Sequence, residues 1–71
     1  MIPPGTLQEI AAIGANLSLN GSVYPPGVLT DVAAICHSKG TTLTVRNSSD
    51  VPPGTLTSLA AMLKGSLVVE D

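Results

Sequence analysis

The tripeptide Pro-Pro-Gly occurs three times in this chain of 71 residues, and each copy opens the same longer pattern. An apolar residue precedes each copy, Thr or Val follows it, and a leucine comes next. Successive copies are 22 and 27 residues apart. Self-similarity at a period of about 20 to 50 residues is the signature of repeat architectures. We therefore expect one domain, residues 1–71, built from three repeats at about 2–23, 24–50 and 51–71.

A short helix is expected after each Pro-Pro-Gly, because apolar residues recur there at the spacing of one helical face. Proline suits the start of a helix, since the N–H that it lacks would have no partner inside the helix. Thr6 and Glu9 can form a capping box in the first repeat. Each helix should end near a glycine in the left-handed conformation, at Gly14, Gly40 and Gly65. The expected apolar faces are Leu7, Ile10, Ala11, Ala12 and Ile13; Leu29, Val32, Ala33, Ala34 and Ile35; and Leu56, Leu59, Ala60, Ala61 and Met62.

A strand is expected beyond each glycine, because the period of the apolar residues changes there from about 3.6 to about 2. The strands fall at 16–20, 42–46 and 66–70. Strands joined through a helix should be parallel with right-handed crossovers, which puts every helix on one face of the sheet. The predicted fold class is thus α/β, a three-repeat helix–strand solenoid with a three-stranded parallel sheet. The rows expected to be buried are Leu17, Leu43 and Leu67, and Leu19, Val45 and Val69.

The other face of the predicted sheet is polar, which is unusual for parallel strands outside solenoids. In the first repeat the spaced apolar residues Leu7, Ile10 and Ile13 precede the short strand Leu17-x-Leu19-Asn20. The two other repeats have similarly spaced apolar residues before a short strand. In this the chain resembles the leucine-rich repeat family. The resemblance implies protein recognition on the strand side. It is imperfect, because Arg46 and Glu70 stand where the asparagine ladder of that family would repeat Asn20.

Composition excludes several classes of function. The net charge is −2, with Lys39, Arg46 and Lys64 as the fixed cations, so we expect no nucleic-acid partner. No apolar run approaches the roughly 20 residues that span a bilayer, so we expect no membrane partner and, by default, a cytoplasmic location. One cysteine and one histidine provide neither a disulfide nor a metal cluster, and no cofactor is expected.

Catalysis is not expected either. Cys36 and His37 are neighbours on a predicted helix and point about 100° apart, which does not form a thiolate–imidazole pair. We interpret Cys36 as a small buried hydrophobe at the end of the second helix and His37 as a residue on a solvated turn. Glu9 and Asp31 are placed in first helical turns, where a carboxylate opposes the helix dipole.

The leading hypothesis is a non-catalytic protein-interaction or scaffold module that works through the polar strand face. One alternative is self-assembly into a homo-oligomer through the uncapped strand edge at the C-terminal end. Another is small-anion binding at the clustered helix N-termini. The residues assigned to protein binding are Ser18, Asn20, Thr42, Thr44, Arg46, Val68 and Glu70, with Arg46 expected beside Glu70.

Overall fold

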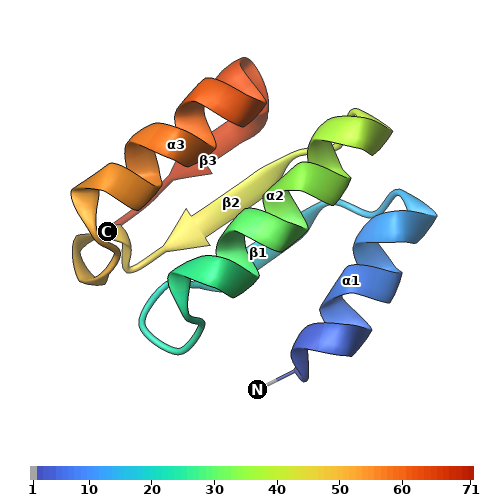
Figure 1. The fold of residues 1–71 in the computed structure, drawn as a ribbon, viewed down its shortest axis with the longest axis horizontal. Helices are drawn as coiled ribbons and strands as arrows, with labels where there is room; N and C mark the ends of the chain where they lie inside the picture. The colour runs from blue at the N-terminus through green and yellow to red at the C-terminus, as the bar shows by residue number, and fades with distance from the viewer. Residues whose placement is uncertain (1) are drawn as a thin grey trace.

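The computed structural model describes residues 2–71, in which three helices and three strands alternate along the chain (Figure 1). Short 3-10 turns follow β2 and α3. The class predicted from the sequence, α/β with a three-stranded parallel sheet, is confirmed. The elements are α1 (Pro4–Ile13), β1 (Leu17–Asn20), α2 (Pro26–Lys39), β2 (Leu43–Arg46), η1 (Ser48–Asp50), α3 (Pro53–Leu63), η2 (Lys64–Ser66) and β3 (Leu67–Val69).

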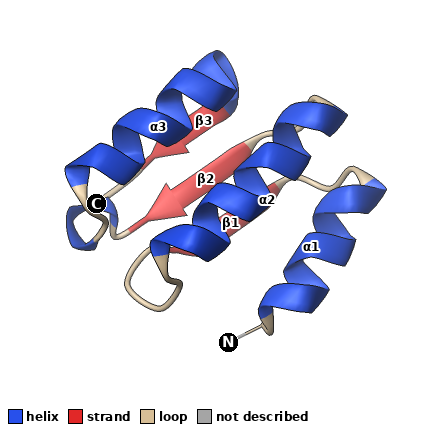
Figure 2. Cartoon of the chain, viewed as in Figure 1, coloured by secondary structure: helices blue, strands red, loops and turns tan. Residues whose placement is uncertain are grey.

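The molecule has two layers, a sheet of order β1-β2-β3 and three helices that all lie on the same side of it (Figure 2). Strand pairing places Leu17 opposite Leu43, and Leu43 opposite Leu67. This is the register predicted from the repeated sequence. We refer to residues 2–23, 24–50 and 51–71 as the first, middle and third units; each contributes one helix and one strand.

Each helix begins at the second proline of its Pro-Pro-Gly, with the first proline as the N-cap. No side chain caps any of the three helices, so the capping box predicted for Thr6 and Glu9 is wrong. Because α1 begins at Pro4, Thr6 is already the third helical residue and has passed the capping position. The same early start puts Glu9 and Asp31 beyond the first turns, which contain no acidic residue.

The helix ends agree with the sequence prediction in two units out of three. Gly14 and Gly40 have left-handed φ angles of 101° and 70°. In the third unit the positive φ, 53°, belongs to Lys64 and not to Gly65 as predicted. The extra length of the middle unit lies in α2, which has 14 residues against 10 in α1 and 11 in α3.

One apolar core lies between the helices and the sheet and draws residues from all three units. The middle unit contributes most of it, including Leu29, Val32 and Val45, which are fully buried. Ala12, Ala34, Ala60 and Ala61 of the expected apolar faces are exposed, and Leu17 and Leu67 of the expected buried rows are only partly buried. Of the large side chains predicted to be buried, two are exposed: Ile13 at 85% and Val69 at 50%. Both belong to end units, where one flank has no neighbouring helix or strand within the part of the chain described.

Candidate functional site

The sheet face opposite the helices is open, and we call its predicted binding residues the strand face (Figure 1). Strand pairing brings Ser18, Thr44 and Val68 into one row across the three strands. Asn20 and Arg46 form a second row on β1 and β2. The strand face as a whole comprises Ser18, Asn20, Thr42, Thr44, Arg46, Val68 and Glu70.

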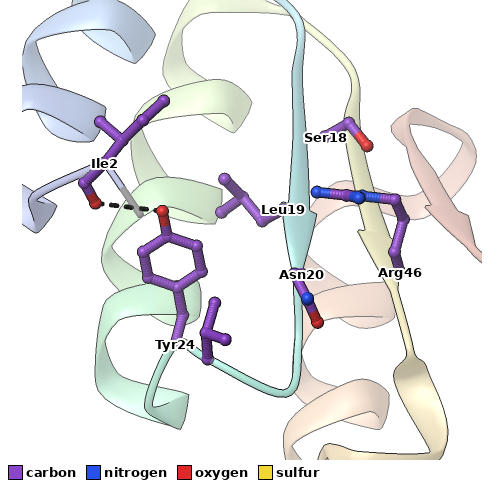
Figure 3. Close-up of a pocket in the computed structure, with 7 residues that line it drawn as sticks. Ile2, Ser18, Leu19, Asn20, Tyr24 and Arg46 are labelled. Atoms are coloured by element: carbon purple, nitrogen blue, oxygen red, sulfur yellow. Dashed lines mark hydrogen bonds between the residues drawn. The ribbon is translucent and has the colours of Figure 1, made fainter.

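The two charged residues of the strand face do not point toward one another. The backbone N–H of Glu70 donates to the carbonyl of Val45, 2.9 Å away, so Glu70 follows β3 beside the end of β2. The Arg46 side chain instead extends toward β1 and Ser18 (Figure 3). Because β1 and β3 lie on opposite sides of β2, the guanidinium group reaches away from Glu70. The predicted Arg46–Glu70 feature is therefore replaced by a cation that leans over the first strand.

A hollow of about 360 Å³ lies beside β1, where Arg46 leans over (Figure 3). Its polar lining contains three strand-face residues, Ser18, Asn20 and Arg46. Its apolar lining comes from three further segments: the start of the chain, the inner side of β1 and the loop that leads into α2. These apolar residues, which the sequence did not point to as a site, are Ile2, Leu19, Val23 and Tyr24.

Tyr24 fixes the wall of the hollow. Its ring is mostly buried, and its hydroxyl donates to the carbonyl oxygen of Ile2 at 3.0 Å (Figure 3). A buried tyrosine usually finds such a partner for its hydroxyl. The contact joins the start of the first unit to the start of the middle unit, 22 residues apart. It therefore holds the apolar side of the hollow against the core.

The Asn20 side chain has a structural role. Its Oδ1 accepts hydrogen bonds from the Ser22 N–H at 2.9 Å and from the Asn47 Nδ2 at 2.8 Å. The Ser22 hydroxyl in turn bonds to the Asp50 carboxylate. Asn47 holds a left-handed backbone, with φ at 52°. This network ties the loop after β1 to the loop after β2, so half of the Asn20 amide is unavailable to a ligand.

Both outer edges of the sheet carry unpaired backbone groups. On the side of β1 that faces β2, the N–H groups of Leu17 and Gly21 donate to the backbone carbonyls of Thr42 and Arg46. In a parallel ladder the intervening residues direct their backbone groups the other way. Ser18 and Asn20 therefore present backbone N–H groups at the free edge of β1, alongside the hollow.

The remaining candidate groups do not come together. Cys36 is fully buried and free, as predicted. His37 is exposed, also as predicted, but it lies inside α2 and not on a turn, because the helix continues to Lys39. Within residues 2–71 no three histidine, cysteine or carboxylate side chains gather as metal ligands would. None of the helices described is long and apolar enough to cross a membrane.

The helix N-termini offer few donors to an anion. The N1 residue of each helix is proline and has no N–H. In the first turn of α2 the N–H groups of Val28 and Leu29 both donate to the Pro25 carbonyl, and in the first turn of α3 those of Thr55 and Leu56 donate to the Pro52 carbonyl. Little beyond the glycine N–H of each Pro-Pro-Gly is left for a ligand.

Comparison of the chain with protein-family models, curated proteins and solved structures finds no match. We therefore infer a function from the geometry of the strand face and of the hollow.

Proposed function

We propose that this chain is a non-catalytic protein-interaction module, a short helix–strand solenoid resembling leucine-rich repeats, which binds through its strand face. The main support is the hollow beside β1. There Arg46, apolar side chains and the free edge of a strand meet at one place. Small-ligand and peptide sites commonly combine an apolar lining with a few convergent polar groups.

The chemistry of the hollow favours an extended peptide segment as the ligand. Such a segment can add itself to the edge of β1 through backbone hydrogen bonds, which is a recurring mode of peptide recognition. One of its apolar side chains would enter the hollow between Val23, Tyr24 and Leu19. A carboxylate on the segment would meet the Arg46 guanidinium, the cation of the lining.

The proposal assigns no catalytic residue to the chain. Cys36, the single thiol, lies inside the core, and the exposed His37 belongs to the helical layer on the other side of the sheet. We place the module in the cytoplasm, where a lone thiol remains reduced.

A peptide selection tests the proposal. Random heptapeptides are selected on the immobilised chain, and the affinities of the selected peptides are measured by fluorescence anisotropy. Arg46→Glu should weaken them by about tenfold, roughly 1.4 kcal/mol, because it places a carboxylate where the ligand carries one.

Lys39→Glu is the matched control. Lys39 is exposed at the end of α2, and its reversal makes the same change in net charge away from the strand face. The affinities should be unchanged in this variant. Selected peptides that bind Arg46→Glu as well as they bind the parent chain would contradict the proposal.

A further inference from the structure

Equivalent positions in the three units differ in burial, and the first difference concerns the third unit. Ala11 and Ala33 occupy the same position after Pro-Pro-Gly in α1 and α2, and both are fully buried. Ala60, at that position in α3, is exposed. Leu56, four residues earlier on the same side of α3, is only partly buried. This side of each helix is therefore covered by the unit that follows it.

In the first unit, burial is lower on the other side, the one that faces away from the middle unit. Ile13 is 85% exposed, whereas Ile35 and Met62, at the same position in α2 and α3, pack against the core. Ile2 is 45% exposed, whereas Tyr24, at the same position in the middle unit, is 8% exposed. This side of each unit is therefore covered by the unit that precedes it.

Two uncovered flanks result. We call Leu56, Ala60 and Val69 the trailing flank, and Ile2, Ile10 and Ile13 the leading flank. At 3.6 residues per turn, the positions three and four residues after a given residue share its face of the helix but lie on opposite flanks of that face, about 100° apart, which matches this division. The middle unit shows what covers each flank in this protein, because its own two flanks meet the third and the first unit.

We propose that a second copy of this chain covers these flanks by stacking head to tail, with the leading flank of one copy against the trailing flank of the next. The inference rests on the proposed function, because it names the partner that enters the hollow beside β1. The contact continues the arrangement that already exists between units. Repetition of a head-to-tail contact gives an open chain of copies, in contrast to a closed symmetric pair.

The backbone at the two edges is complementary in the continued register. Glu70 donates its N–H to Val45, so the neighbouring Val69 directs its backbone groups to the free edge of β3. Ser18 directs its N–H and C=O to the free edge of β1, and Asn20 directs its N–H there, while the Asn20 carbonyl accepts from the Val23 N–H. Continuing the observed pairing sets Val69 of one copy opposite Leu19 of the next. The groups left open on one strand then face those left open on the other.

The hollow and its cation also fit this partner. In the continued register, Glu70 of the incoming copy lies beside Asn20, on the open face of the sheet. The Arg46 side chain already extends across β1 toward that edge (Figure 3). Val69, which is 50% exposed in the single chain, would contact the apolar lining at Leu19. An apolar side chain followed by a carboxylate is the ligand that the hollow favours.

Two substitutions block one flank each. Ile13→Glu places a charge on the leading flank, and Ala60→Glu does so on the trailing flank. Both positions are exposed in the single chain, so the fold should persist, which circular dichroism checks. Ala12→Glu and Ala61→Glu are matched controls, because the position they share is exposed in all three units. Sedimentation velocity is then measured over a wide range of protein concentrations.

The parent chain and both controls should sediment faster as concentration rises, beyond the value for a 7.1 kDa chain. Ile13→Glu and Ala60→Glu should each remain monomeric. Mixed in equal amounts, they should form a species of twice that mass and nothing larger, because each retains one usable flank. A parent chain that stays monomeric would overturn the inference.

A closed pair through β3 would also overturn it, and gives a different result. In that case Ile13→Glu assembles like the parent, and mixing it with Ala60→Glu produces no capped pair. The outcome is separable from the proposed function: a monomeric parent chain that still binds selected peptides in an Arg46-dependent way removes only the second copy as partner.

Discussion

The middle unit and the two end units carry nearly the same apolar pattern, yet they differ in how much of it they bury. The large hydrophobic side chains that are exposed within residues 2–71 are Ile2, Ile13, Val23, Val68 and Val69, and all of them belong to end units. The middle unit has a neighbour on both sides and none of these. Burial in this fold is thus set by the adjacent unit as much as by residue type. A two-layer protein of this kind gains its core laterally, one unit against the next.

The largest expected loss of stability comes from replacing Leu29 of the middle unit, and the equivalent Leu56 of the third unit provides the comparison. Leu29→Ala should destabilise the chain by about 3 kcal/mol, because it removes a fully buried side chain and leaves a cavity. Leu56→Ala should cost about half as much, since its site already meets solvent on the trailing flank. Urea unfolding followed by circular dichroism at low concentration measures both. Equal losses would mean that the middle and third units are equally enclosed.

Gly21→Ala tests how closely the first and middle units pack against the start of the third. A Cβ at this position would lie 2.5 Å from Val51 Cγ2 and 3.0 Å from the Arg46 carbonyl oxygen. Such overpacking should cost about 2 kcal/mol of unfolding free energy. Gly54→Ala is the control: a Cβ there meets nothing within 4 Å, and alanine favours the helix, so stability should rise slightly. Thermal melts of the two variants should shift in opposite directions; a Gly21→Ala melt equal to the parent's would refute the close packing of this loop.

The smallest expected changes in stability come from glycine substitutions at Lys64 and Asn47, the two non-glycine residues with positive φ in the part of the chain described. Lys64 has φ 53° and ψ −122°, a region that glycine enters freely, so Lys64→Gly should stabilise the chain by about 1 kcal/mol. Asn47 has φ 52° and ψ 44°, which asparagine tolerates, and its side chain bonds to Asn20. Asn47→Gly should therefore lower the stability. Urea midpoints give both signs, and a loss of stability in Lys64→Gly would show that its backbone is unstrained.

The order of elements and the register of the sheet followed from local signals. Pro-Pro-Gly sets the start of each helix, and the change in apolar period marks each strand. Local signals failed where a distant neighbour decides the outcome. Val69 matches the buried Leu19 and Val45 in the repeat, and Ile13 matches the partly buried Ile35 and Met62. Both are exposed because no unit lies beyond them in the part of the chain described.

The candidate site was predicted only in part, for a similar reason. Alternation along the strands identified Ser18, Asn20 and Arg46 as members of one face, and these three do line the hollow. Its apolar lining comes from segments that meet only after folding, such as Ile2 and Tyr24. The direction of the Arg46 side chain is likewise a property of packing, for which the sequence has no periodic signal.

The central claim is that β2 lies between two strands whose outer edges are open in the single chain. Amide hydrogen exchange, followed by NMR at low protein concentration, tests it with neighbouring residues. Gly21 and Glu70 donate to β2 carbonyls and should exchange at least about tenfold more slowly than Asn20 and Val69, which face the open edges. Raising the concentration should then slow Asn20 and Val69. Protection of Asn20 and Val69 equal to that of Gly21 and Glu70 in the dilute chain would contradict the account.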